Sequence, residues 1–168
     1  MPKVFISSTT LGLGPYREIV SEVLIVQGFK PIVQEYFDTP DCPIIHELRE
    51  KIADAQRVIA LVGPFYGTAS PADNPRLPGM KLSYTQFELE FALHYRKPTL
   101  VLFAGPRFNP EATSLGNPPT QSESLAKLQT EFIRWIKARA DADAGRSVFN
   151  DRFELAMALA KIDWRTWR

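Results

Sequence analysis

The chain has 168 residues, of which 45% are hydrophobic and 23% charged, and its formal net charge is +1. This composition is typical of a globular protein, and the length suffices for one domain with a full hydrophobic core. The near-neutral charge argues against a nucleic-acid partner or an anionic membrane surface. Cys42 is the only cysteine, which excludes an internal disulfide. We expect a cytoplasmic protein without a membrane anchor, because the first residues enter a strand directly and every apolar run is short.

The spacing of apolar residues predicts strands and helices that alternate along the chain. Strands are expected at 4–6, 31–33, 58–62 and 98–103, with a short edge strand at 148–149. Helices are expected to begin at Gly14 and Pro43, and to cover 83–96 and about 122–140. A last helix follows Asn150, which we expect to be its N-cap. The Gly- and Pro-rich stretches 63–82 and 104–120 are expected to be long loops.

The predicted strands are apolar on both faces, which indicates a parallel sheet covered by helices on both sides. Right-handed crossovers then favour a flavodoxin-like α/β fold, with three layers (α/β/α) and a four- to five-stranded parallel sheet. We expect a single domain over residues 1–168, with its motifs in 3–103 and a C-terminal helical part at 121–163. Ligands of such folds bind at the carboxyl ends of the strands.

Four segments are predicted to meet at that edge of the sheet: 7–10, 34–37, 63–67 and the loop after Phe103. The hydroxyls of Ser7, Ser8 and Thr9 could bind ribose or phosphate oxygens, or could satisfy the backbone of their own turn. Phe65 and Tyr66 could stack on a base or a nicotinamide ring, or could close the sheet edge as buried aromatics.

Glu88 lies in the first turns of the predicted helix 83–96, which follows a loop from this edge. A carboxylate there could face a cleft and assist cleavage of an N-glycosidic bond. The alternative is a capping role, because Thr85-x-x-Glu88 and Ser83-x-x-Gln86 both fit the capping box. In a capping box the acid only returns a hydrogen bond to a backbone amide, so the pattern leaves both interpretations open.

Other sites have weaker support in the sequence. Glu35 and Glu90 are secondary candidates, and Glu90 is expected to face solvent because it projects away from Glu88 on the helix. The chain contains neither a G-K-[ST] phosphate loop nor a G-x-S-x-G nucleophile elbow. His46 and His94 lack metal-ligand spacing with any other ligand motif, so the sequence predicts no metal site.

Three stretches of the sequence combine into a recognisable set of motifs. The first is Val4-Phe5-Ile6-Ser7-Ser8-Thr9, followed by Tyr16-Arg17, and the second is Gly63-Pro64-Phe65-Tyr66-Gly67. The third is Ser83-Tyr84-Thr85-Gln86-Phe87-Glu88 with Lys97-Pro98-Thr99-Leu100-Val101. Together they resemble the opening V-F-[IV]-S-S-T, the G-x-x-Y-G, and the S-x-T-x-x-E and K-P-[VT]-L-V of a TIR-like family. That family was long catalogued only as a domain of unknown function and stands at the front of signalling NTPases. The match covers 3–103, and 104–168 agree only in helical pattern. The chain departs from the family at Gly12-Leu13, where a D-[LM] pair is frequent, and at Gln86, where a second acid is usual.

The resemblance implies a flavodoxin-like sheet and an activity, because many TIR-type domains cleave NAD+ at the nicotinamide–ribose bond with one glutamate. By position that catalytic glutamate is Glu88. The other implied substrate-binding residues are Ser7, Ser8, Thr9, Phe65, Tyr66, Ser83 and Tyr84. NAD+ would be the substrate, and no cofactor or metal would be needed.

The resemblance also implies how the activity would be controlled. The domain would act in bacterial antiphage defence, as a homo-oligomer triggered by a sensor or NTPase module, either fused or separate. Two alternatives remain: a non-catalytic TIR-like module for self-association, and an enzyme similar to nucleoside 2-deoxyribosyltransferases. The latter would also need an acidic residue to hold the sugar hydroxyls, and the plausible ones are Asp38 and Asp41.

Overall fold

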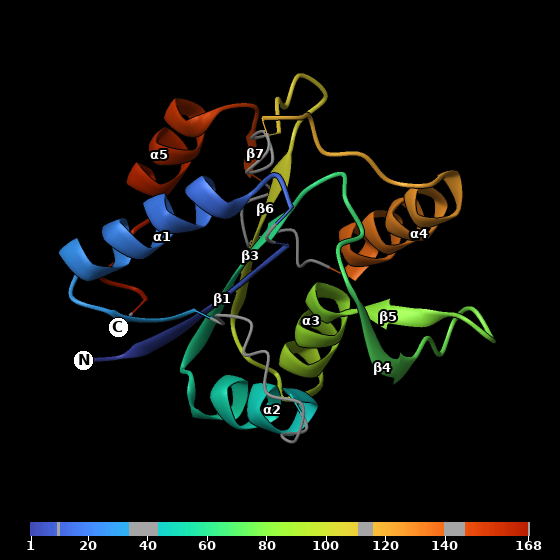
Figure 1. Cartoon of the computed structure of the whole chain (residues 1–168). Helices are drawn as coiled ribbons and strands as arrows, with labels where there is room; N and C mark the ends of the chain where they lie inside the picture. Colours follow the sequence, from blue (N-terminus) through green and yellow to red (C-terminus); the bar gives the residue numbers. More distant parts are fainter. Residues whose placement is uncertain (10, 34–43, 111–115, 140–146, 168) are drawn as a thin grey trace.

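The computed structural model describes residues 1–9, 11–33, 44–110, 116–139 and 147–167. Five strands form one sheet in the order β2-β1-β3-β6-β7 (Figure 1), and every neighbouring pair is parallel. Their bounds are β1 (Lys3–Ser8), β2 (Lys30–Val33), β3 (Arg57–Val62), β6 (Thr99–Ala104) and β7 (Ser147–Phe149). This order is that of flavodoxin-like folds. The predicted fold class and all five predicted strands are confirmed.

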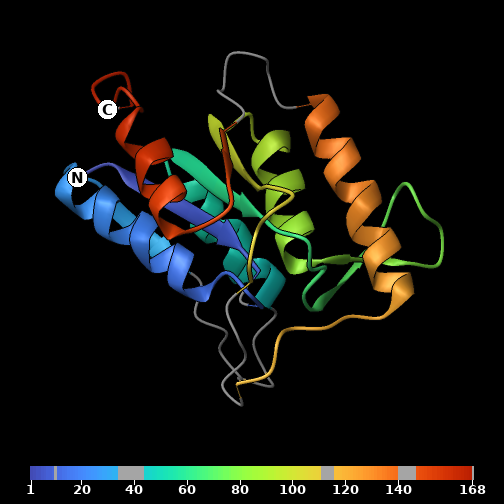
Figure 2. The same ribbon diagram turned by 90° about the horizontal axis from the view of Figure 1, so that it is seen from above.

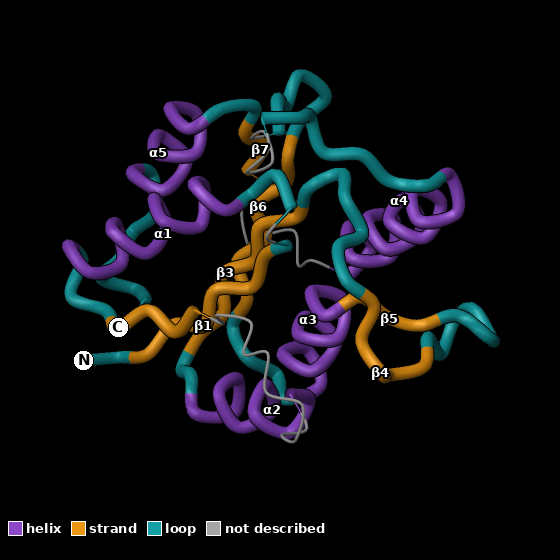
Figure 3. The backbone as a smooth tube through the Cα atoms, viewed as in Figure 1, coloured by secondary structure: helices purple, strands orange, loops and turns teal. Residues whose placement is uncertain are grey.

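Helices cover both faces of this sheet, as Figure 3 shows. Their bounds are α1 (Gly14–Val26), α2 (Ile44–Asp54), α3 (Tyr84–His94), α4 (Glu123–Arg139) and α5 (Arg152–Ala160). Helices α1 and α5 pack on one face, and α2, α3 and α4 on the other. The molecule therefore has the three layers that the apolar strands predict. Among the described helices none is long and apolar enough to cross a bilayer.

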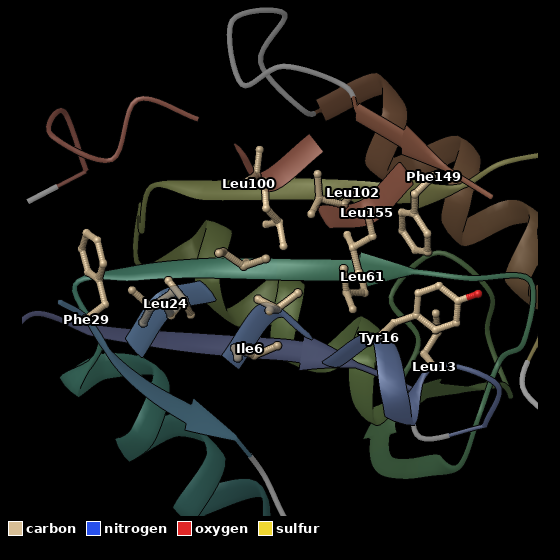
Figure 4. Close-up of a cluster of buried hydrophobic side chains, with 14 of the residues drawn as sticks. Ile6, Leu13, Tyr16, Leu24, Phe29, Leu61, Leu100, Leu102, Phe149 and Leu155 are labelled. Atoms are coloured by element: carbon tan, nitrogen blue, oxygen red, sulfur yellow. The ribbon is translucent and has the colours of Figure 1, made fainter. Parts of the chain in front are cut away.

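Alternation along the central strands divides the core between the two faces. On β1, Val4 and Ile6 join the cluster under α1 and α5, whereas Phe5 joins the cluster under α2 and α3. Figure 4 shows the first cluster, in which Ile6 and Leu61 of neighbouring strands meet side chains of α1 and α5. The face to which a strand residue points thus decides which helix it meets, and the same rule places the polar residues at the strand ends.

The stretch 63–82 was expected to be a loop throughout, and this prediction is wrong. It contains an antiparallel hairpin of β4 (Ala69–Asp73) and β5 (Lys81–Ser83). The hairpin turn is closed by a hydrogen bond from the Asn74 amide to the Met80 carbonyl (2.9 Å). These strands are short and largely polar, and their register is interrupted, so their sequence lacks the apolar alternation of a longer strand. Figure 2 shows the hairpin beside α4. Arg76 of the hairpin connects the two, because its Cζ lies 4.2 Å from the centroid of the Trp135 ring on α4.

The N-cap of the last helix also differs from the expectation. Asp151, not Asn150, caps α5, and its carboxylate accepts a hydrogen bond from the Glu154 amide (2.8 Å). Asn150 instead donates through its amide side chain to the Glu154 carboxylate (2.8 Å) and accepts from the Arg107 amide (2.9 Å). Both residues are good N-cap formers, so the two positions cannot be separated by residue preference alone.

Candidate functional site

Ser7 lies near the carboxyl end of β1, at the point where the strand connections diverge to opposite sides of the sheet. Flavodoxin-like folds bind ligands at this switch point. Ser7 follows Phe5 by two residues, so it projects to the same face, toward α3. Its register neighbour on β3 is Ala60. Because both side chains are small, the sheet leaves space here for a polar group from the covering helix.

Glu88 of α3 fills that space. The Ser7 hydroxyl donates a hydrogen bond to Glu88 Oε2 at 2.5 Å, although the residues are 81 positions apart. Both residues are buried, with 0% of Ser7 and 5% of Glu88 exposed. The structure therefore brings together two of the residues that the sequence singled out, in a polar contact beneath the helix layer.

The capping box at the start of α3 is formed by Ser83 and Gln86. The Gln86 amide donates to Ser83 Oγ (3.2 Å), and the Ser83 amide donates to Gln86 Oε1 (3.1 Å). The alternative box, in which Glu88 would return a hydrogen bond to Thr85, is not the one that forms. Gln86 takes the capping role, and the Glu88 carboxyl is left to face the sheet.

Burial dominates the electrostatics of Glu88. Desolvation raises the pKa of its carboxyl from 4.5 to about 8, and the Ser7 hydrogen bond and the Arg17 charge oppose this rise. Arg17 lies in the first turns of α1, where the sequence analysis quoted it only as part of a motif. A lone arginine near a helix start gives no sequence signal that its charge reaches a carboxyl on another helix.

The expectation of an open cleft at Glu88 is not met in the described residues, because the carboxyl is covered. A groove that the structure does contain lies elsewhere, between α2, α3 and the hairpin, and Glu88 does not line it. In the part of the chain that the structure describes, the Glu88 carboxyl is thus buried and does not line a cleft.

Ser8 and Thr9 are two buried residues, 8% and 4% exposed, whose hydroxyl oxygens have no hydrogen-bond partner among the described residues. Such groups are uncommon in folded proteins because desolvation without a partner is costly. Ser8 projects from β1 to the face opposite Ser7, which is the side of α1. The strand end thus holds one hydrogen-bonded hydroxyl, at Ser7, and two that have no partner within the described segments.

The turn after β1 and the loop after β3 pack against each other. Gly67 has a positive φ of 78°, and an added Cβ there would lie 2.8 Å from the Thr9 methyl group. An added Cβ at Gly12 would lie 3.4 Å from the Phe65 ring. Two of the segments predicted at this edge therefore do meet, and the contact of Gly67 with Thr9 leaves no space for a side chain at position 67.

Phe65 and Tyr66 are both buried, at 8% and 2% exposed. The Tyr66 hydroxyl donates to the Lys81 carbonyl (2.6 Å), and burial raises the pKa of this phenol. Tyr66 therefore ties the loop to the hairpin in this structure, and its ring presents no free face for stacking. This is the plug arrangement that the sequence analysis gave as the alternative to nicotinamide stacking.

The remaining predicted residues lie around the start of α3. Ser83 is buried in the capping box, and Tyr84 is half-buried against the cluster beneath α2 and α3. Glu90 was expected to face solvent, but its Oε1 is buried and forms an ion pair with Arg76 Nη2 at 2.6 Å. The angles of this contact are not those of a hydrogen bond. His46 is exposed on α2 and lies 3.2 Å from Glu50.

Two glutamines that the sequence analysis did not single out hold the loop after β3. Gln121 donates to the Pro64 carbonyl (2.7 Å) and accepts from the Tyr66 amide (3.0 Å). Gln129 of α4 donates to the Gly63 carbonyl (2.6 Å). No local pattern marks them, because their partners are far away in the sequence.

Several predicted positions lie outside the described residues: Thr10, the segment 34–37 with Glu35, and Asp38, Asp41 and Cys42. Within the described ranges, no group of three His, Cys, Asp or Glu side chains could hold a metal ion.

Comparison with solved structures returns remote similarities. One is to the structure of Clostridium botulinum CMP N-glycosidase, BcmB, with 15% identity, 95% of this chain and 99% of that chain covered, and a TM-score of 0.49. Another is to a 3-dehydroquinate dehydratase-like protein from Bifidobacterium longum, with 10% identity, 84% and 100% covered, and a TM-score of 0.35. No curated protein matches the sequence.

A family model matches nearly the whole chain, over residues 3–161. This range contains every motif on which the sequence resemblance rests, together with Ser7, Arg17 and Glu88. The chain belongs to the family described as Domain of unknown function (DUF4062).

Proposed function

We propose that this chain cleaves the N-glycosidic bond between nicotinamide and ribose in NAD+, with Glu88 as the catalytic carboxylate. The observation that carries the proposal is the buried Glu88 carboxyl, held by Ser7 at the carboxyl end of a central strand. A buried carboxyl with a strongly perturbed pKa at the switch point of a flavodoxin-like sheet is a marker of a functional site. The resemblance to TIR-type enzymes points to the same residue.

The proposed reaction needs no general acid. The bond between C1′ of the ribose and the pyridinium nitrogen breaks, and its electron pair neutralises the ring, so nicotinamide leaves as a neutral molecule. The ribose develops oxocarbenium character, which a nearby carboxylate stabilises. Water then adds to C1′ and releases a proton to give ADP-ribose, or an adenine nitrogen adds to give a cyclic isomer.

A cationic substrate would oppose the rise in the Glu88 pKa. With a pKa of about 8, roughly a tenth of the Glu88 carboxyls are ionised at neutral pH in the free protein. A pyridinium ring beside the carboxyl favours the ionised form, so that binding of NAD+ and loss of the Glu88 proton support each other. The hydroxyls of Ser8 and Thr9, for which the described segments offer no partner, are suited to pair with ribose or phosphate oxygens of the same substrate.

The proposal includes an opening step, because Glu88 is only 5% exposed. We propose that assembly into a homo-oligomer, under the control of a sensor or NTPase module, moves the residues that cover the carboxyl. A protein of this kind is inactive as a monomer, which suits a domain that destroys an essential cofactor of its own cell.

The same raised pKa favours a second candidate. A Glu88 that is protonated at neutral pH could donate its proton to the leaving base of a neutral nucleoside, as a general acid does. This activity would be that of a nucleoside N-glycosidase, whereas a deoxyribosyltransferase would use the Glu88 carboxylate at the glycosidic carbon. The two candidates differ in the sign of their pH dependence, since the NAD+ reaction needs the carboxylate and the nucleoside reaction needs the acid.

The test is an assay of substrate choice with the protein clustered by fusion to an oligomeric carrier. NAD+ and a set of deoxynucleosides with an acceptor base are incubated separately, and free bases and ADP-ribose products are measured by chromatography. We expect nicotinamide release from NAD+ and unchanged deoxynucleosides. Release of a free base from a deoxynucleoside would favour the second candidate, and base exchange would favour a deoxyribosyltransferase. Concentration-dependent oligomers without turnover of either substrate would favour a non-catalytic interaction module.

A further inference from the structure

A groove of about 510 Å³ lies between α2, α3 and the β4–β5 hairpin. These three elements lie in the lower part of the molecule as Figure 1 shows it. Its volume is within the range of small-molecule sites. Neither Ser7 nor Glu88 lines it, so it is separate from the site proposed above.

Aromatic rings form one wall of the groove. Phe87, Phe91 and Tyr95 follow one another at intervals of four residues along α3, which places them in one stripe. The ring centroids of Phe87 and Phe91 are 5.9 Å apart, and those of Phe91 and Tyr95 are 4.4 Å apart. Tyr95 is 50% exposed. An aromatic ligand would find a largely preformed surface for stacking here.

Arg49 of α2 brings a positive charge to this wall. Its guanidinium lies 5.7 Å from the Phe87 ring centroid and 5.6 Å from that of Phe91. In the part of the chain that the structure describes, no carboxylate pairs with Arg49. Its exposed N–H groups therefore remain available to an anion, for which a planar guanidinium is well suited.

The two carboxylates at the groove are each matched by a cation. Asp73 Oδ1 lies 2.6 Å from Lys81 Nζ, and Glu90 Oε1 lies 2.6 Å from Arg76 Nη2. Among the described residues, Arg49 therefore lines the groove without an ion-pair partner, and it gives the groove a positive charge.

We propose that this groove is a binding site for a small planar aromatic anion, with its ring against Phe91 and Tyr95 and its carboxylate or phosphate at Arg49. This inference goes beyond the proposed function, because it concerns a different cavity and a different ligand. A ligand there contacts Phe87, which directly precedes Glu88 on α3. The groove and the candidate catalytic residue are therefore parts of the same helix, although Glu88 does not line the groove.

The test uses three probes of equal ring size: 2-naphthoate, neutral 2-naphthalenemethanol and cationic 2-naphthylmethylammonium. Each is titrated into the isotope-labelled protein while backbone amide resonances are followed by NMR. We expect saturable shifts at α3 and the hairpin, with naphthoate bound about fivefold more tightly than the other probes. Tighter binding of the cation, or the absence of saturable shifts in these elements, would overturn the proposal.

Variants separate the groove from the rest of the molecule. Arg49→Gln should weaken naphthoate binding about fivefold, whereas Arg134→Gln, which removes an arginine from α4, should not change it. Glu88→Gln should also bind naphthoate normally, so a failure of the proposed NAD+ chemistry leaves this result intact. Equal affinity in wild type and Arg49→Gln, with all variants folded, would contradict the anion site.

Discussion

The Ser7 hydroxyl on β1 donates a 2.5 Å hydrogen bond to the Glu88 carboxyl on α3. This bond connects the central strand of the sheet to the helix that covers it, and it is buried from solvent on both sides. It also fixes the position of a carboxyl whose ionisation burial opposes. The stability of the fold and the chemistry of the site are therefore linked through one protonation state.

The first prediction concerns stability and pH. Burial raises the pKa of Glu88 from 4.5 in the unfolded chain to about 8 in the folded protein. The stability that its proton contributes is therefore fully present below pH 4.5, declines as the pH rises, and is lost above about pH 8. Between about pH 5 and 7, wild type should therefore lose up to about 3 kcal/mol relative to Glu88→Gln. Urea unfolding at several pH values measures this difference, with Glu90→Gln as the control. Parallel pH curves for wild type and Glu88→Gln would contradict it.

The second prediction compares adjacent serines. Ser7→Ala removes the donor to a buried carboxyl and should lower the free energy of unfolding by about 1–2 kcal/mol. Ser8→Ala removes a buried hydroxyl without a described partner and should be neutral or slightly stabilising. Chemical denaturation of both variants measures the difference. An equal loss of stability in the two variants would show that the Ser7–Glu88 hydrogen bond makes no specific contribution to the free energy of unfolding.

The third prediction concerns the contact between the two loops at the sheet edge. Gly67 and Gly79 both have positive φ, at 78° and 81°, so alanine is strained at either position. Only at Gly67 does an added Cβ meet another residue, Thr9, at 2.8 Å. Gly67→Ala should therefore destabilise the protein by about 1–2 kcal/mol more than Gly79→Ala, as measured by thermal unfolding. Equal losses of stability in the two variants would mean that Thr9 moves away from the added Cβ without a measurable loss of stability.

The sequence was sufficient to predict the sheet, because its central strands are continuously apolar and its helices carry regular apolar stripes. Val58–Val62 is an example, and it forms β3 as expected. The hairpin was missed because Lys81–Ser83 is too short and polar to show a period. Local sequence patterns therefore predicted the parallel sheet and its helices, but not the β4–β5 hairpin between β3 and α3.

The site could be predicted only in part. Glu88 and Ser7 were singled out separately, but their hydrogen bond depends on which face of β1 each residue occupies and on the small neighbour Ala60. The choice between two overlapping capping boxes was also decided by tertiary structure, because the sheet offers the Glu88 carboxyl a partner that the helix start does not. The charge effect of Arg17 on Glu88 left no trace in the local sequence.

The fourth prediction concerns the pH dependence of NAD+ cleavage. If the ionised Glu88 is required, kcat/KM should rise about tenfold per pH unit and level off near pH 8. Ser7→Ala should move the inflection to higher pH, because the Ser7 hydrogen bond lowers the pKa of Glu88. Initial rates of nicotinamide release between pH 5 and about 9 provide the profile. A rate that falls above pH 8 would instead identify Glu88 as a general acid.

The most direct measurement is nicotinamide release from NAD+ by clustered wild type, Glu88→Gln and Glu90→Gln. The two variants make the same chemical change two positions apart on α3, but only Glu88 contacts Ser7. We expect Glu90→Gln to retain activity within a few-fold of wild type and Glu88→Gln to lose about a thousandfold or more. Equal rates of release by wild type and Glu88→Gln would contradict the assignment of Glu88 as the catalytic residue.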